Sequence, residues 1–227
     1  MAPIRIKLCP ESRYSIKCPF TRTPTRIVVH NTGNDATAEN EISYMIRNSE
    51  EKSFHYAVDD KEIVQGLPLN RNAWASGDGR GKGNMEGIHI EICYSLSGGE
   101  RFAKAEQNAA QLIASLLKQY GWGIDKVTKH QDYDGKYCPH RTLGLGWQRF
   151  LNIVKSYMKG GGEEMRYNKI SEMPIWAQPT IKKLCDKKLL SGNGGSKDSN
   201  GYPADLDLSA DMIRILAIND RAGVYGE

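Results

Sequence analysis

The sequence has 227 residues, of which 39% are hydrophobic and 26% are charged, a composition typical of a folded globular protein. No stretch approaches the ~20 consecutive apolar residues that span a bilayer, which excludes a membrane-embedded protein. The formal net charge of +4 comes without a dense Lys/Arg run, and this argues against a nucleic-acid-binding function.

The N-terminus and the cysteines predict a chain that is made and kept in a cytoplasm until it is released. Residues 1–17 lack the apolar region of a secretory signal peptide. The five cysteines are odd in number and widely spaced, which argues against a disulfide framework. We therefore expect most of them to be reduced and buried.

Strand and helix patterns alternate along residues 26–158 and predict an α/β domain with a central sheet. The segment 88–93 alternates strictly, so its isoleucines face one side of the sheet while His89 and Glu91 face the other. In chain order, the expected elements are a strand over 26–30, a helix over 39–48, a hairpin of strands 54–58 and 62–65, a strand over 88–93, and helices over 105–120, ended by Gly121, and 147–154.

A run of three glycines and two acids within residues 159–164 predicts a flexible linker. It separates a main domain, residues 1–158, from a small domain, residues 165–227. The main domain has 21 Lys and Arg against 17 Asp and Glu, whereas the remaining residues have ten of each. The mildly basic character, which suits an anionic partner, therefore belongs to the main domain.

The small domain is expected to be mainly helical. A first helix is predicted over 170–192, with Trp176 and Leu189 among its core-facing residues. A second helix is predicted after Ser209, its expected N-cap. Two helices in about sixty residues make a marginal core, which favours docking or self-association.

Three residues stand out as candidate metal ligands: His30 at a strand end, and His130 and Cys138 in one loop. Two imidazoles and a thiolate suit Zn²⁺, and three protein ligands leave a fourth position open, as in catalytic zinc sites. Taken singly, each has an ordinary structural interpretation: a strand cap, a surface histidine and a buried thiol.

The combined motifs favour the metal site, because together they resemble a known family. Segments 28–32 (VVHNT), 54–59 (FHYAVD), 72–75 (NAWA), 90–94 (IEICY) and 129–138 (KHQDYDGKYC) match, in order and approximate spacing, the type 2 N-acetylmuramoyl-L-alanine amidases. These enzymes share their fold with peptidoglycan recognition proteins, and the likeness is greatest to endolysins of phages that infect Gram-positive bacteria. The resemblance covers roughly residues 20–158. It implies a central mixed β-sheet flanked by helices and cleavage of the amide bond between N-acetylmuramic acid and L-alanine.

The resemblance also implies roles for individual residues. His30, His130 and Cys138 would hold Zn²⁺, which activates a water molecule. Glu91 would be the general base, and Lys136 would stabilise the oxyanion. The competing interpretations are a salt-bridged carboxylate for Glu91 and an exposed loop lysine for Lys136.

One departure from the family pattern bears on this mechanism. Many members have a tyrosine before the histidine of the hairpin motif, where this chain has Phe54. Phe54 has no hydroxyl group, so the expected mechanism depends more strongly on Glu91 as the general base.

Asn31, Thr32 and Trp74 are the expected substrate contacts. Trp74 precedes a Gly-rich loop over 76–84 that lacks the spacing of a phosphate-binding loop, so a wall of the substrate groove is the better interpretation. A place in the core is equally open for Trp74. The expected substrate is bacterial peptidoglycan, with neither nucleic acid nor membrane as a partner.

The small domain resembles a single S-layer-homology-like unit, over a short match. This implies binding to secondary wall polymers, and a dimerisation or packing module is weighed equally. Codons for Gly161 to Glu164 are purine-rich, like a ribosome-binding site, so internal initiation at Met165 is a further hypothesis.

Two other functions compete with the enzyme. A non-catalytic peptidoglycan-recognition protein on the same fold would be expected to lack a zinc ligand, whereas Cys138 is present. A nucleic-acid-binding protein with a structural zinc would need a fourth ligand and a basic face. Without a signal peptide, the enzyme would reach the wall from the host cytoplasm through a phage-made, holin-type membrane lesion.

Overall fold

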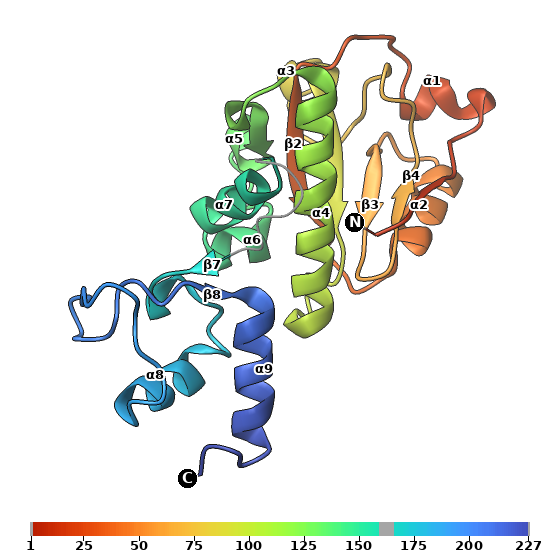
Figure 1. The fold of residues 1–227 in the computed structure, drawn as a ribbon. Coiled ribbons are helices and arrows are strands. Elements are labelled where there is room, and N and C mark those ends of the chain that lie inside the picture. Colours follow the sequence, from red (N-terminus) through yellow and green to blue (C-terminus); the bar gives the residue numbers. More distant parts are fainter. Residues whose placement is uncertain (1, 159–165, 227) are drawn as a thin grey trace. The chain divides into compact units, whose positions relative to one another are not determined.

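The computed structural model describes residues 2–158 and 166–226, and Figure 1 shows its ribbon. The chain divides into two compact units, Met1–Lys159 and Gly160–Glu227, and each has buried apolar residues of its own. The predicted linker, residues 159–164, and Met165 lie outside the described residues.

A six-stranded mixed sheet with the order β1-β4-β3-β5-β2-β6 forms the centre of the first unit. β3 and β4 pair antiparallel, and the other four neighbouring pairs run parallel. This confirms the predicted mixed sheet. The strands are β1 (Ile4–Ile6), β2 (Arg26–Asn31), β3 (Tyr56–Val58), β4 (Ile63–Gln65), β5 (Gly87–Ile92) and β6 (Val127–Lys129).

Helices flank this sheet, and the longest of them, α4, runs along it (Figure 1). α4 packs on β5 and β3, and α7 packs on α4. The helices are α1 (Tyr14–Lys17), α2 (Ala38–Arg47), α3 (Lys82–Glu86), α4 (Gly99–Tyr120), α5 (Gln131–Asp134), α6 (His140–Leu145) and α7 (Trp147–Met158), with 3-10 turns η1 (Glu11–Arg13) and η2 (Ile124–Lys126).

The ends of the predicted elements follow local chemistry. The β3–β4 hairpin turns at Asp59, whose carboxylate accepts hydrogen bonds from the backbone N–H groups of Lys61 and Glu62 at 2.7 and 2.8 Å. α4 ends at Gly121 in the left-handed conformation (φ 67°), as predicted. α4 begins at Gly99 rather than at residue 105, because the buried stripe continues back to Phe102.

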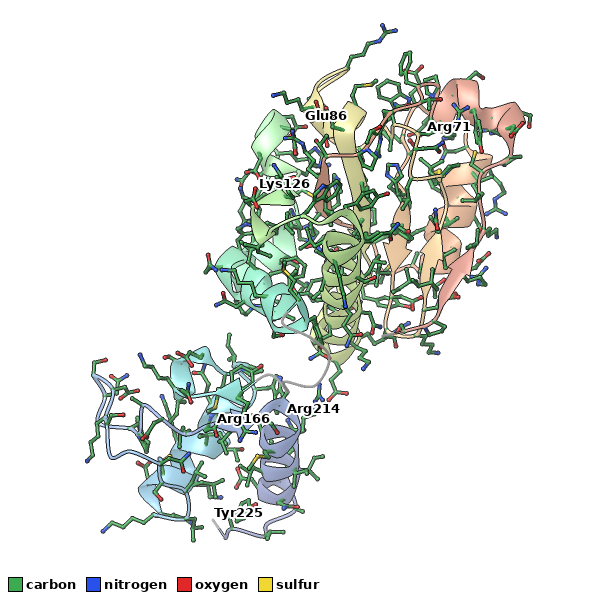
Figure 2. The ribbon with its side chains drawn as sticks, turned by 45° about the horizontal axis from the view of Figure 1, so that its top comes forward. Arg71, Glu86, Lys126, Arg166, Arg214 and Tyr225 are labelled. Carbon is green, nitrogen blue, oxygen red and sulfur yellow. The ribbon has the colours of Figure 1, made fainter. Side chains whose placement is uncertain are left out.

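A buried lysine joins α1 to the segment that follows α2. Lys17 is fully buried, and its ammonium donates to the Asn48 side chain (2.7 Å), to the backbone carbonyl of Lys52 (3.2 Å) and to that of Glu50. Nearby, the guanidinium of Arg71, which is labelled in Figure 2, lies 4.2 Å from the centroid of the Tyr14 ring of α1. The segment 48–52 is thereby held to the core by charge-assisted hydrogen bonds.

The second unit contains a two-stranded antiparallel sheet, two α-helices and a 3-10 turn. Its elements are β7 (Arg166–Tyr167), η3 (Ile170–Glu172), α8 (Gln178–Asp186), β8 (Leu208–Ser209) and α9 (Ala210–Arg221). Each of these elements contributes an apolar side chain to the core of the unit. Among them are Tyr167, Ile170, Ile181, Leu184, Leu208 and Ile213. The Ser209 side chain caps α9, as predicted, by accepting from the Met212 backbone N–H at 3.1 Å.

The predicted helix over 170–192 is wrong in extent. Pro174 cannot continue a helix from η3, so α8 begins only at Gln178, with Pro179 in its first turn. Trp176 and Leu189 therefore fall outside the helix and are 45% and 60% exposed rather than core-facing. Among the described residues, no helix combines the length and the apolar character needed to cross a membrane.

Candidate metal centre

His30, His130 and Cys138 meet at one edge of the sheet. His30 lies near the end of β2, and His130 follows β6, the parallel neighbour of β2. The His130 backbone N–H donates to the Val29 carbonyl at 3.2 Å, which aligns the two histidines although 100 residues separate them. Cys138 returns to the same edge after α5, where its carbonyl accepts from the Gln131 N–H at 3.0 Å.

The three side chains form a compact, buried donor set. One ligand atom from each lies within 4.8 Å of the others, and all three residues are at least 95% buried. The two Nδ1 atoms of His30 and His130 face each other at 3.2 Å. This group can hold a metal ion.

The protonation states of the three side chains suit the binding of a metal cation. Burial holds the pKa of His30 well below its usual range, which leaves the ring neutral as a metal ligand must be. On His130, Nε2 lies 3.1 Å from the Asp134 carboxylate, which only accepts hydrogen bonds, so a neutral His130 has its lone pair on Nδ1. Burial raises the pKa of Cys138 to about 11, so a thiolate forms there only if a cation compensates its charge.

A cleft of about 670 Å³ opens over this donor set. Its walls come from the end of α2 and the following segment 48–54, from the Gly-rich loop, and from the loop after α5. The lining residues include the three donors together with Asn31, Glu41, Phe54, Trp74, Arg80, Glu91, Asp134 and Lys136. The donors are therefore buried from bulk solvent but open to a bound substrate.

Glu91 lies next to the donor set, on the neighbouring strand. In the parallel β2–β5 pair its backbone position is opposite His30. Its Oε2 is buried without a hydrogen-bond partner among the described residues, which does not fit the salt-bridge interpretation. Burial, followed by the negative charge of Glu41, raises the pKa of Glu91 to about 8, and Lys136 opposes this shift.

Lys136 is exposed on the loop between His130 and Cys138 and lines the cleft. Its charge lowers the pKa of both Glu91 and Cys138, against the larger effect of burial. The Asp134 carboxylate accepts from the Lys136 backbone N–H at 2.8 Å while its other oxygen faces His130. One carboxylate thus orients both the loop and an imidazole.

The three expected substrate contacts have different surroundings. Trp74 lines the cleft and also packs edge-on against Phe20, with ring centroids 6.1 Å apart. Asn31 lines the cleft, but its side-chain oxygen accepts from the N–H groups of Arg141 and Thr142 at the start of α6. Thr32 is 95% buried, does not line the cleft, and donates its hydroxyl to the Asn34 carbonyl at 3.1 Å. The structure gives Asn31 and Thr32 structural contacts.

Two partners of the donor set were not predicted. Asp134 ends the short helix α5 and stands four residues after His130, the residue before that helix, and this spacing of about one helical turn was available as a signal. His89 shares the strand face of Glu91, as expected from the alternation, but it is fully buried and its Nδ1 lies 2.9 Å from His30 Nε2. Burial lowers the pKa of His89 to about 3, so its ring is neutral.

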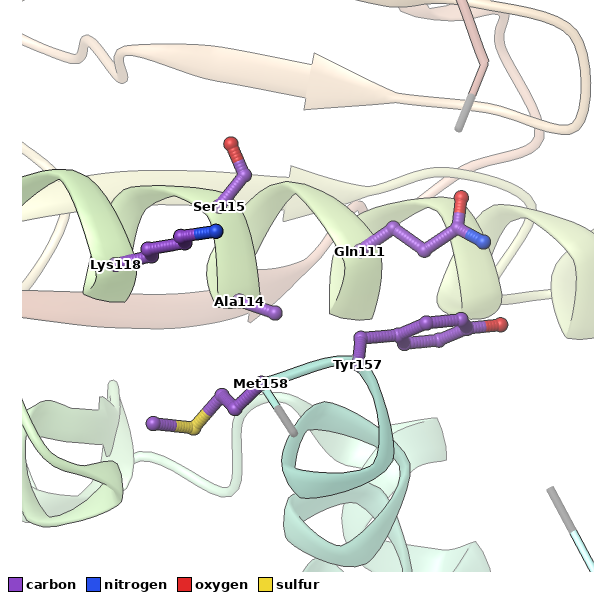
Figure 3. Close-up of a pocket in the computed structure, with 6 residues that line it drawn as sticks. All are labelled: Gln111, Ala114, Ser115, Lys118, Tyr157 and Met158. Atoms are coloured by element: carbon purple, nitrogen blue, oxygen red, sulfur yellow. The ribbon is translucent and has the colours of Figure 1, made fainter. Parts of the chain in front are cut away.

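A second hollow, which shares no lining residue with the cleft, lies between α4 and α7 (Figure 3). It measures about 240 Å³ and is lined by Gln111, Ala114, Ser115, Lys118, Tyr157 and Met158. It brings together no group of metal-binding side chains.

Comparison with known proteins gives one consistent family. A family model described as N-acetylmuramoyl-L-alanine amidase matches residues 20–141. The N-acetylmuramoyl-L-alanine amidase CwlA of Bacillus subtilis is 51% identical over 187 residues, which cover 82% of this chain and 69% of CwlA. The amidase XlyB of the same organism is 53% identical over 161 residues, which cover 70% of this chain and 51% of XlyB. The matched region thus spans about half the length of XlyB.

Solved structures show the same relation for the first unit. The structure of PlyL is 55% identical in sequence and superposes with a TM-score of 0.67. The match covers 68% of this chain and 98% of PlyL.

Proposed function

The chain belongs to the N-acetylmuramoyl-L-alanine amidase family, and from this premise we propose that it hydrolyses the amide bond between N-acetylmuramic acid and L-alanine in bacterial peptidoglycan. The observation that carries the proposal is the juxtaposition of His30, His130 and Cys138 with the unpartnered Oε2 of Glu91 in one cleft. A metal-binding group with a candidate base beside it is the arrangement that metal-assisted hydrolysis requires.

Zinc is the metal that these donors fit best. Zn–N bonds of ~2.0–2.1 Å in a tetrahedral arrangement place two nitrogen ligands about 3.4 Å apart, close to the observed 3.2 Å between the Nδ1 atoms of His30 and His130. The mixture of imidazole and thiolate favours Zn²⁺ over Mg²⁺ or Ca²⁺. Bound there, the ion would polarise the scissile carbonyl and make a water molecule acidic enough to lose a proton near neutral pH.

Glu91 moves the proton in this mechanism. Its carboxylate takes the proton from the attacking water, whose oxygen bonds to the carbonyl carbon. The carbon–nitrogen bond then breaks, and Glu91 gives the proton to the departing amine of L-alanine. A pKa raised toward neutrality suits a group that must both accept and donate.

The other cleft residues position the substrate. Lys136 lines the cleft, and its ammonium would stabilise negative charge on the carbonyl oxygen. Trp74 offers the exposed part of its ring to a sugar or a stem peptide. Phe54 lines the cleft at the position where family members have a tyrosine and brings no hydroxyl group to the reaction.

A digest of purified Gram-positive peptidoglycan tests the activity, with new amino groups and new reducing ends measured with and without a chelator. New alanine amino groups without reducing ends, lost on chelation and restored by zinc, are expected. New reducing ends would indicate a glycosidase and overturn the mechanism. Wall binding and zinc binding without any product would place the chain among non-catalytic recognition proteins.

For the second unit, we propose binding to secondary polymers of the wall. Its helix α9 carries exposed apolar side chains on one side, at Met212, Ile215 and Ile218, which are 44%, 57% and 61% exposed. Substitution of Ile215 and Ile218 by Asp in a Glu91→Gln background is expected to reduce co-sedimentation with insoluble walls. Unchanged wall binding with a loss of dimer in sedimentation velocity would assign this face to self-association instead.

An endolysin role accounts for access to the wall. We propose that the chain leaves the cytoplasm through a phage-made membrane lesion, so lysis should require co-expression of a lesion-forming protein. Lysis by the enzyme alone would contradict this route. Internal initiation at Met165 remains part of the proposal, and a single product that is unaffected by recoding the preceding glycine and glutamate codons would refute it.

A further inference from the structure

A line of hydrogen bonds lies behind His30, on the side away from the cleft. His30 Nε2 lies 2.9 Å from His89 Nδ1, and His89 Nε2 lies 3.0 Å from the backbone carbonyl of Gly83. The line ends at a group that can only accept. The direction of every hydrogen bond in it therefore follows from the Gly83 carbonyl.

The proton positions can be assigned from that end. Since the Gly83 carbonyl accepts, His89 carries its proton on Nε2, and the neutral ring then has a lone pair on Nδ1. That lone pair accepts from His30, which must carry its proton on Nε2. The remaining nitrogen of His30, Nδ1, is left with a lone pair that faces His130 across 3.2 Å.

His89 is itself held in one orientation. Its backbone N–H donates to His55 Nδ1 at 3.0 Å, and the two rings stack at 9° with centroids 5.8 Å apart. His55 is fixed in turn, because its Nε2 lies 2.9 Å from the Arg71 carbonyl. His89 is fully buried and does not line the cleft, so it contacts a metal ligand but not the substrate.

The carbonyl at the end of the line is also fixed. Gly83 lies in the short helix α3, which follows the Gly-rich loop, and its N–H donates to the Asp78 carboxylate at 2.7 Å. A Cβ atom at Gly83 would lie 2.7 Å from Ser76 and 2.8 Å from Tyr133, so the backbone fits closely into its surroundings. Helix α3 thus presents the Gly83 carbonyl to His89 in a single position.

We propose that His89 is a positioning residue of the metal centre, which fixes the Nε2-protonated tautomer of His30 and so presents the Nδ1 lone pair to the metal. This inference rests on the proposed metal site. It assigns to His89 the role that carboxylates or carbonyl groups usually have behind a metal-bound histidine. Asp134 has the corresponding place behind His130.

Two variants of nearly equal size separate this role from simple packing. In His89→Asn the side-chain amide places an oxygen near the position of Nδ1 and can accept from His30, whereas His89→Leu has no acceptor. Both variants lose the hydrogen bond to Gly83. Any difference between them therefore reports the acceptor for His30.

Zinc affinity of the full chain is measured first, by competition with a chromophoric chelator. His89→Leu is expected to lose about 10–100-fold in affinity relative to wild type, and His89→Asn is expected to keep most of it. Long-range ¹H–¹⁵N spectra of the metal-free protein should show His30 protonated on Nε2 in wild type and His89→Asn, with that preference lost in His89→Leu. Equal zinc affinities of the Leu and Asn variants would overturn the inference.

The outcomes also distinguish this inference from the proposed function. If wild type binds zinc and His89→Leu binds it equally well, the metal site stands and the role of His89 fails. If wild type binds no zinc, the proposed site fails. The wild-type ¹⁵N spectrum decides the tautomer independently of metal binding and of whether the variants fold, and a His30 proton on Nδ1 would overturn the inference.

Discussion

Replacing the buried Lys17 by Met should destabilise the fold and weaken substrate binding at the same time. The ammonium joins the core to the segment 48–52, whose residues line the cleft together with the metal donors. Methionine fills a similar volume but donates nothing, so the carbonyl groups of Glu50 and Lys52 lose their partner. The segment is then free to move away from the cleft.

The magnitude follows from the contacts. Three hydrogen bonds from a charged donor, at about 1.5 kcal/mol each, contribute about 4.5 kcal/mol, and roughly 2 kcal/mol of desolvation is recovered when the charge is removed. The free energy of unfolding should therefore fall by about 2–3 kcal/mol, which lowers Tm by about 5–10 °C. A loss of about 1 kcal/mol in substrate binding raises KM about fivefold, with kcat little changed.

Calorimetry and the release of amino groups from peptidoglycan measure both effects. Lys52→Met is the matched control, because it removes a lysine from the same segment whose side chain is 79% exposed and pairs with the Glu50 carboxylate. The backbone carbonyl groups that accept from Lys17 are kept in this variant. Zinc content should stay at the wild-type level in both variants. An unchanged Tm for Lys17→Met, or a loss of kcat with an unchanged KM, would refute the reasoning.

Other predictions concern the centre itself. Glu91→Gln should lower kcat by about 10²–10⁴-fold while zinc content is retained, and loss of the metal in this variant would show that Glu91 is needed for binding instead. Burial raises the folded-state pKa of Glu91 to about 8, so the free energy of unfolding of the metal-free protein should fall as pH rises from about 4.5 to 8. Urea unfolding of Glu91→Gln should show a smaller decrease over the same pH range. Asp134→Ala should weaken zinc binding about 10–100-fold in chelator competition, whereas Asp132→Ala, which removes a neighbouring surface ion pair, should not. Asn31→Ala should cost about 2–3 kcal/mol in the free energy of unfolding, since it leaves two N–H groups of α6 without their acceptor; a change in KM alone would restore Asn31 as a substrate contact.

Strong periodicity in the sequence predicted the parts of the fold that are most buried. The alternation of β5 and the stripe of α4 reflect burial on one face, and both elements are found near the expected positions. β1 was not predicted, because its three residues are all exposed and show no pattern. Likewise, the apolar residues around α8 matched a helix, while the two prolines that limit it acted through backbone geometry rather than hydropathy.

The candidate site shows a similar division. The residue types of His30, His130 and Cys138 indicated metal chemistry, but only the parallel pairing of β2 with β6 explains how they meet. The surroundings of His89 and Thr32 could not be predicted, because neighbouring strands and loops determine which polar atoms are already hydrogen-bonded. Burial and partners, unlike residue type, are properties of the folded chain.

The long separation between the donors has a mechanical consequence. An ion bound by His30, His130 and Cys138 closes a loop of about a hundred residues, much as a covalent cross-link would. This cross-link joins β2 to the segment after β6, the last strand of the sheet to be synthesised. The metal site therefore cannot form until nearly the whole first unit has been synthesised. The metal can therefore bind only after the first unit has folded, and a chelator would remove a cross-link between β2 and the segment that follows β6.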